Sequence, residues 1–172
     1  MRRVVIVGCG GAVKSTLARA IAERTGLPVI HLDREFWRPG WVEPVRDEFE
    51  ERVKVLMTGE RWIIDGNYHR TLASRVAAAD MIIALDLPTR TCLAGIIRRW
   101  WRQRGKTRPD MTPGCPERLT WEFVRWVWRF RRDTRPKQMA LLESAAAGKA
   151  MHVLRSRGDV QRWLDSVPGK AA

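Results

Sequence analysis

The chain has 172 residues, of which 45% are hydrophobic and 30% charged, and its formal net charge is +13. This length and composition predict one globular domain, 1–172, and argue against a two-domain protein. The sequence has no apolar run near the roughly 20 residues of a membrane span and no signal-peptide pattern, so we expect a cytoplasmic protein without a membrane partner.

The first two elements flank a glycine-rich loop. Residues 3–7 are an apolar, β-branched run that predicts a buried strand, and residues 14–24 predict a helix with one apolar face. Between them the sequence reads Gly8-Cys9-Gly10-Gly11-Ala12-Val13-Lys14-Ser15-Thr16. This is the phosphate-binding loop pattern of Gly, four residues, Gly, Lys and Ser or Thr, with Val13 in place of the second Gly. Strand, loop and helix in this order predict an anion site at the helix N-terminus.

The loop predicts the cofactors ATP and Mg²⁺. Lys14 is expected to bridge the β- and γ-phosphates, and the Ser15 hydroxyl is expected to bind the metal. The main chain of such a loop surrounds the phosphates. The predicted cofactor-binding residues of this loop are Gly8, Gly10, Gly11, Ala12, Val13, Lys14, Ser15 and Thr16.

Val13 leaves three interpretations open. Glycine is used at such positions because φ is positive or because the main chain approaches the phosphate closely. A β-branched residue at positive φ carries strain of about 1 to 3 kcal/mol. The substitution therefore indicates weakened nucleotide binding, a loop reshaped around another anion, or a deliberate change of sequence.

Further along the chain, apolar runs alternate with helical patterns. Strands are expected at 27–32, 61–65, 81–86 and 151–154. Helices are expected at 43–57, 68–79, 89–103, 119–133, 136–148 and 160–167. Continuous apolar strands that alternate with helices predict a five-stranded parallel sheet covered on both faces, which is the three-layer α/β/α P-loop NTPase fold.

Polar residues close four of these strands, namely Asp33, Asp65, Asp86 and Arg155. Ligand sites of parallel sheets lie beyond the carboxyl ends of the strands, so we expect these residues to approach Lys14. A single acid at a strand end is commonly a helix cap or a turn former. Several acids around a phosphate loop favour a site for Mg²⁺ and for a phosphoryl acceptor.

Positive charge concentrates in residues 89–137, which carry an excess of ten of the thirteen net positive charges. Arg98 and Arg102 share one helix face, and Arg125, Arg129 and Arg132 form a stripe on another. A loop rich in turn residues, 105–116, connects these helices and is expected to be mobile. The pattern predicts an arginine-rich helical lid, 98–132, that closes over transferred phosphate.

The same segment supports a second interpretation. Five of its residues are tryptophans, and basic residues interleaved with aromatic ones can bind nucleic acid by phosphate contact and base stacking. The tryptophans are Trp100, Trp101, Trp121, Trp126 and Trp128. The three cysteines, Cys9, Cys92 and Cys115, are widely spaced and predict neither a disulfide framework nor a zinc site.

The order of these motifs resembles the P-loop nucleoside monophosphate kinase group, which includes adenylate, shikimate and gluconate kinases. Within it, the chain is similar to the small bacterial adenylate kinase-like proteins often labelled DNA topology modulation proteins. The resemblance covers nearly the whole chain. It is carried by the loop at 8–16, His31-Leu32-Asp33 with Trp37, the segments 62–68 and 85–88, Thr107-Arg108-Pro109-Asp110, and 114–118.

The resemblance implies roles residue by residue. It places Asp33 at the acceptor hydroxyl or at a metal-bound water, Asp65 at a metal-bound water, and Arg70 at an acceptor phosphate. It also implies that Arg98 and Arg102 are the paired arginines that precede the lid. The segment after Asp65 departs from the adenylate kinase pattern, since its Pro is absent and its Arg comes later.

Together these observations predict an ATP-dependent kinase that transfers phosphate to a hydroxyl or phosphate group of a small molecule or nucleotide. Its predicted catalytic residues are Lys14, Asp33, Arg98, Arg102 and Arg129. Asp33, Asp65 and Arg70 are predicted to bind the acceptor, Ser15 and Asp65 the metal, and Arg155 the nucleotide. Two alternatives on the same fold stay open, a nucleic-acid-binding regulator and a protein that only binds nucleotide or another anion.

Overall fold

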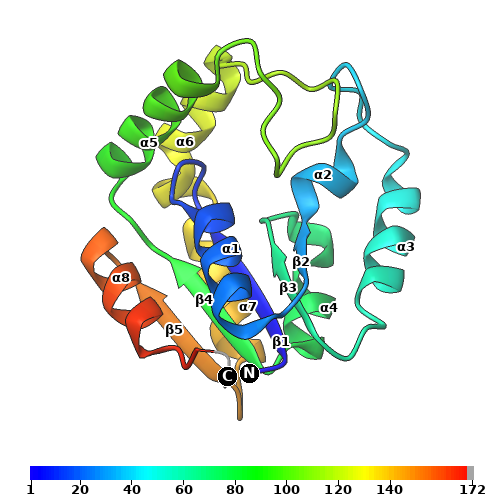
Figure 1. Ribbon diagram of the computed structural model, residues 1–172, viewed down its shortest axis with the longest axis vertical. Helices are drawn as coiled ribbons and strands as arrows, with labels where there is room; N and C mark the ends of the chain where they lie inside the picture. Colours follow the sequence, from blue (N-terminus) through cyan, green and yellow to red (C-terminus); the bar gives the residue numbers. More distant parts are fainter. Residues whose placement is uncertain (170–172) are drawn as a thin grey trace.

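A parallel sheet forms the centre of the structure (Figure 1). The computed structural model describes residues 1–169, and within them five strands pair in the order β2-β3-β1-β4-β5. The strands are β1 (Arg3–Gly8), β2 (Val29–His31), β3 (Trp62–Asp65), β4 (Met81–Leu85) and β5 (Ala150–Leu154). All four pairings are parallel among these residues, as the sequence predicts.

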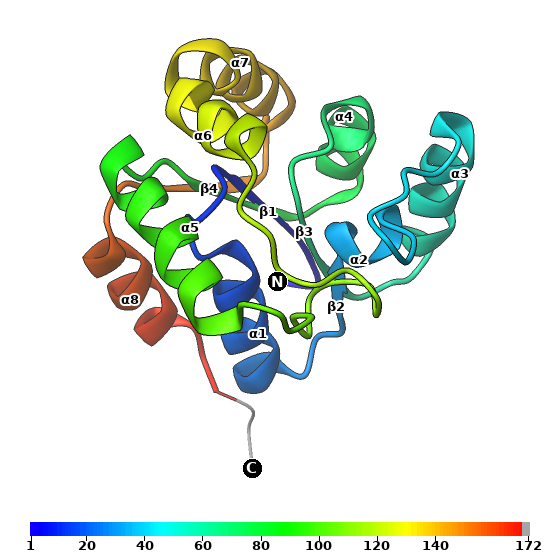
Figure 2. The same cartoon turned by 90° about the horizontal axis from the view of Figure 1, so that it is seen from above.

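Helices cover both faces of the sheet, which confirms the predicted three-layer fold. Figure 2 shows α1 (Lys14–Thr25), α5 (Thr89–Gln103) and α8 (Arg157–Ser166) on one side of the sheet. On the other side lie α3 (Arg46–Leu56), α4 (His69–Ala78) and α7 (Arg135–Ala145). Helix α6 (Trp121–Asp133) contacts both α5 and α7.

The alternating side chains of β1 explain why the sheet needs two covering layers. Val4 and Ile6 pack into the core on the side of α1, whereas Val5 and Val7 pack into the core on the side of α4. All four are fully buried. Because successive side chains of a strand point to opposite faces, a continuous apolar run is stable only between two layers.

The second strand is shorter than predicted. The sequence suggests a strand over 27–32, but only Val29–His31 pair with β3, and residues Leu32–Phe36 form the short helix α2. Leu27 and Leu32 lie outside the paired residues, and each is buried in a different core cluster, which explains why the apolar run is longer than the strand. Asp33 consequently lies in the first turn of a helix rather than in a loop.

Two helices, α6 and α8, begin at capped residues that differ from the starts predicted from the apolar pattern, 119 and 160. Helix α6 begins at Trp121, where the Thr120 side chain accepts a hydrogen bond from the Phe123 N–H. Helix α8 begins at Arg157 behind a capping box formed by Ser156 and Asp159, three residues before the predicted start. Across residues 1–169 no helix has both the length and the apolar character needed to cross a membrane.

Candidate functional site

A cavity of about 1110 Å³ lies at the carboxyl edge of the sheet. Its walls come from the glycine-rich loop, from α2, from the residues after β3, and from α5 and α6. Residues 104–120, which link α5 to α6 and which we call the lid loop, arch over this edge toward α2 (Figures 1 and 2). The structure thus gathers the ends of several elements around one space, as parallel sheets predict.

The glycine-rich loop has the turn that a phosphate-binding loop requires. Gly11 has φ 77° and Val13 has φ 60°, and Val13 immediately precedes α1. Left-handed residues at these alternate positions turn main-chain N–H groups toward one concave side, where α1 adds the N–H groups of its first turn. Val13 therefore keeps the conformation expected of glycine, and its side chain packs against the core.

Lys14 forms hydrogen bonds with the main chain of the glycine-rich loop. Its ammonium group donates hydrogen bonds to the carbonyl oxygens of Gly8 and Cys9, at 3.0 and 3.1 Å. The Ala12 N–H also donates to the Cys9 carbonyl. These bonds keep the positive charge of Lys14 at the loop, and Lys14 lines the cavity.

Close packing against α5 and α6 supports the loop from behind. A Cβ atom on Gly11 would lie 2.2 Å from the Cys92 carbonyl oxygen, and one on Gly95 would lie 2.4 Å from the Gly11 carbonyl oxygen. A Cβ on Gly10 would meet the Phe123 ring at 2.7 Å. Gly95 looks unremarkable in sequence, because a glycine inside a helix signals nothing until its neighbour is known.

Two carboxylates enter the cavity from β3 and α2. Asp65, at the end of β3, is 4% exposed and lies 2.7 Å from the Nδ1 atom of His31. The Tyr68 hydroxyl donates a 2.8 Å hydrogen bond to Asp33, and burial together with this carboxylate raises the pKa of Tyr68. Both acids are therefore held in defined positions beside the glycine-rich loop.

Arg75 binds the segment that follows β3. The sequence pattern does not predict this role. Its guanidinium group is fully buried and donates to the carbonyl oxygens of Gly66, Asn67 and Tyr68, at 2.9, 2.5 and 3.1 Å. Burial lowers the pKa of Arg75 to about 9, so the side chain stays charged at neutral pH. In sequence it resembles an ordinary helix arginine.

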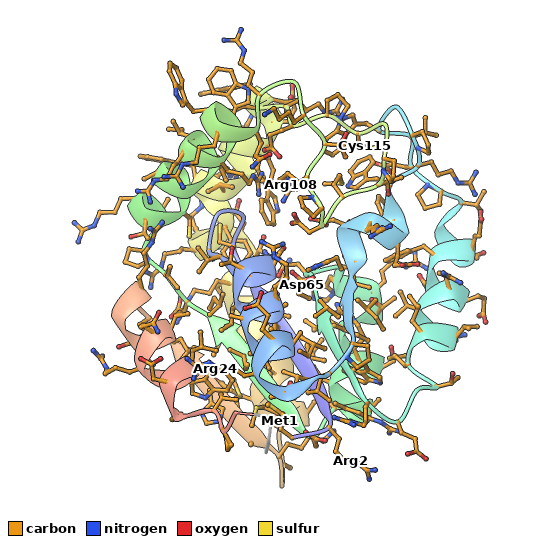
Figure 3. The ribbon with its side chains drawn as sticks, in the orientation of Figure 1. Met1, Arg2, Arg24, Asp65, Arg108 and Cys115 are labelled. Carbon is orange, nitrogen blue, oxygen red and sulfur yellow. The ribbon has the colours of Figure 1, made fainter. Side chains whose placement is uncertain are left out.

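The lid loop brings further charged residues to the cavity. Arg108 pairs with Asp110 and with Glu117, both at 2.7 Å, and Glu117 also pairs with Arg99 of α5 at 2.9 Å. Figure 3 labels Asp65 at the end of β3, with Arg108 and Cys115 on the lid loop. The i, i+4 spacing in the sequence indicates Arg98 and Arg102 but not Arg99, which lies on the same helix.

Most of the predicted residues meet in this cavity. Its lining includes residues Gly10, Gly11, Ala12, Val13, Lys14, Ser15, Thr16, Asp33, Asp65, Arg98 and Arg102. Gly8 lies beneath them, where a Cβ atom would be 2.6 Å from the Leu85 carbonyl oxygen. The predicted roles of all these residues stay predictions, because position alone does not test them.

Four residues that the sequence predicts near the site do not line the cavity. Arg70 pairs with Glu50 of α3, Arg129 with Asp133 at 2.7 Å, and Asp86 with Arg135 through 2.6 and 2.7 Å bonds. Within residues 1–169 these side chains and Arg155 lie outside the lining of the cavity. Asp86 therefore joins β4 to α7 in this structure, whereas the strand-end pattern suggests that it approaches Lys14.

The donor set fits Mg²⁺. The Ser15 hydroxyl and the Asp65 carboxylate are hard oxygen donors on the cavity wall, which Mg²⁺ prefers. Among residues 1–169, no three His, Cys, Asp or Glu side chains are grouped as a metal cage. Mg²⁺ usually keeps waters and binds through one or two protein oxygens plus substrate phosphates, so such a cage is not required.

Comparisons with known proteins show the fold. Shikimate kinase from Acinetobacter baumannii, in complex with shikimate, matches 97% of this chain and 90% of its own, with TM-score 0.60 and 15% identity. Shikimate kinase from Bacteroides thetaiotaomicron matches 95% of this chain and 94% of its own, with TM-score 0.56 and 15% identity.

A nucleoside kinase is also similar. Deoxyadenosine kinase from M. mycoides with bound dATP matches 96% of this chain and 98% of its own, with TM-score 0.51 and 14% identity. No family model and no curated protein matches the sequence. The chain thus has the fold of P-loop kinases.

Proposed function

We propose that this protein is an ATP- and Mg²⁺-dependent kinase that transfers the γ-phosphoryl group to a hydroxyl group of a small molecule. The observation that carries the proposal is the cavity itself, in which Lys14 and Ser15 lie on one wall and Asp33 on another. Single-ligand pockets commonly have volumes of roughly 300 to 1,000 Å³. A cavity of about 1110 Å³ has room for a nucleotide and an acceptor together.

The chain's own residues would act by positioning and by charge neutralisation. Lys14 and the loop N–H groups would bind the phosphates, and Ser15 and Asp65 would hold Mg²⁺, which when bound neutralises phosphate charge. Asp33 would accept a hydrogen bond from the acceptor hydroxyl and take up its proton. The acceptor oxygen then forms a bond to Pγ, the bond from Pγ to the bridging oxygen breaks, and ADP leaves.

The surroundings of Asp33 favour a hydroxyl acceptor over a nucleoside monophosphate. Trp37, Trp41 and Tyr68 line the cavity together with Asp33 and Glu43. A phosphate acceptor needs several arginines at its own end of the site, whereas the predicted one, Arg70, pairs with Glu50, and Arg118 stacks on the Trp41 ring, 4.4 Å from its centroid. Aromatic rings and acids suit a small polyhydroxylated or planar acceptor better than a second phosphate.

Nucleotide binding tests the first half of the proposal. We expect Mg-ATP to bind in calorimetric titration and Lys14→Ala to weaken binding by at least about 100-fold, or ~3 kcal/mol, because a charge-assisted contact to phosphate is lost. Lys54→Ala is the matched control. Its exposed ammonium group pairs with Glu51 on α3, so affinity should not change.

Transfer tests the second half. A panel of hydroxyl-bearing small molecules, screened by ADP release, should contain an acceptor whose turnover Asp33→Asn lowers much more than it lowers ATP affinity. Equal ATP binding by Lys14→Ala would contradict the proposal. ATP binding without turnover of any acceptor by this chain or by Val13→Gly would favour the binding-only alternative.

A further inference from the structure

The Asp110 carboxylate lies among groups that bind anions. Asp110 belongs to the lid loop, yet it is buried and lines the cavity. One carboxylate oxygen is 2.7 Å from the Nη1 atom of Arg108, and the other is 3.7 Å from the Nη1 atom of Arg19 on α1. Ser15, in the first turn of α1, lines the same cavity.

These partners keep Asp110 negatively charged. Burial alone would raise the pKa of Asp110, but the positive charge of Arg108 lowers it overall. Two guanidinium groups and a hydroxyl are also the donors that proteins use for phosphate. The carboxylate therefore has the chemical surroundings of a phosphoryl group.

The rest of the lid loop is fastened so that Asp110 stays in place. The Thr112 hydroxyl lies 2.7 Å from the carbonyl oxygen of Arg34 and 2.6 Å from that of Trp37. Close by, the Gly40 N–H donates to the Gly114 carbonyl oxygen at 3.0 Å. These contacts join the lid loop to α2 and to the residues after it, so the loop crosses the cavity as a docked segment.

We propose that Ser15, Arg19 and Arg108 form a subsite for a phosphoryl group and that the Asp110 carboxylate fills it, so that Asp110 and phosphate compete for the same donors. The identity of the phosphate as part of a nucleotide rests on the function proposed above. Two anions cannot share these donors without strong repulsion. Phosphate binding consequently requires the lid loop to release Asp110, and the apparent affinity falls by the fraction of molecules in which Asp110 is bound.

Removing the carboxylate tests the competition. We expect Asp110→Asn to tighten ATP binding by about tenfold in calorimetric titration, because the competing state is weakened. Amide hydrogen exchange of the lid loop should rise in the same variant without nucleotide. Glu122→Gln is the matched control. It removes an equal charge from an exposed residue on the cavity wall, so general electrostatics alone would tighten both variants equally.

The outcomes separate this proposal from the proposed function. Inorganic pyrophosphate is titrated in parallel, and tighter pyrophosphate binding without ATP binding would keep the subsite while removing the nucleotide. Unchanged or weaker binding of both ligands to Asp110→Asn would overturn the competition. Asp110→Ser repeats the test with a small polar residue, and thermal unfolding of both variants checks that the fold persists.

Discussion

At the scale of single residues, Val13 is a strained position on the cavity wall. A β-branched residue at φ 60° loses about 1 to 3 kcal/mol relative to a relaxed main chain, whereas glycine accepts this conformation freely. We expect Val13→Gly to raise the free energy of unfolding by ~1 kcal/mol, since relief of strain exceeds the lost burial of a partly exposed side chain. Urea denaturation measures the change. A loss of stability would show that packing of the Val13 methyls outweighs strain.

Arg75 is the shared hydrogen-bond donor for the main chain of residues 66–68. Arg75→Met leaves three carbonyl oxygens of residues 66–68 without their shared donor and should cost about 3 kcal/mol or more. Arg70→Met, on the same helix, removes a half-exposed pair with Glu50 and should cost only about 1 kcal/mol. Thermal unfolding of the two variants measures the difference. Similar losses would contradict the role assigned to Arg75.

Sequence predicts those site residues whose signal is local. Lys14 and Ser15 follow from the loop pattern, and Asp33 and Asp65 follow from their places after apolar runs. Gly95 and Asp110 depend on partners distant in sequence, Gly11 and Arg19, whereas Arg75 depends on how the residues seven to nine positions before it fold. A buried arginine, a helix glycine touching a loop, and a lid carboxylate near Arg19 are recognisable only when both partners are placed.

At the scale of elements, an ion pair joins β4 to α7. Arg135 binds both oxygens of Asp86, at 2.6 and 2.7 Å. Although burial alone would raise the pKa of Asp86, the hydrogen bond and charge of Arg135 lower it overall. We expect Asp86→Asn to cost about 1 to 3 kcal/mol at neutral pH. Asp133→Asn, which removes an exposed carboxylate, should leave the Tm nearly unchanged.

The pH dependence of this pair has a definite sign. Because the pKa of Asp86 is depressed in the folded state, its stabilisation is fully present above the ordinary pKa of aspartate, near 3.8, and is lost as pH falls below that value. The gap in stability between the protein and Asp86→Asn should therefore narrow below about pH 4. Urea denaturation from pH 7 to pH 3 measures this gap. A constant gap would assign the effect of the substitution to packing.

Element boundaries were predictable where an apolar pattern and strand pairing coincide. The run before Asp65 pairs as expected, whereas the run 27–32 mixes paired residues with residues buried beyond the strand. The lid loop lacks periodicity, so its sequence predicts a mobile segment. Its docking depends on hydrogen bonds to Arg34, Trp37 and Gly40, none of which is marked by a pattern.

At the scale of the whole molecule, residues 89–137 combine basic residues with exposed aromatic ones. Some of their arginines line the cavity. Three of their tryptophans, Trp101, Trp121 and Trp128, are 74, 73 and 68% exposed. We expect single-stranded DNA to bind only through charge, with affinity that falls steeply as salt rises. Trp121→Ala with Trp128→Ala should leave this affinity unchanged in fluorescence anisotropy. A tenfold loss would instead support base stacking and the nucleic-acid alternative.

The contact between Gly11 and Gly95 limits how this molecule can open. Neither position has space for a single added carbon, so the glycine-rich loop and the middle of α5 are in direct main-chain contact. We expect any release of the lid loop to pivot beyond the end of α5, at Gly105, which has φ 72°. In such a movement only the lid loop between α5 and α6 would be displaced, and the arginines of α5 would stay in place while substrates enter and leave.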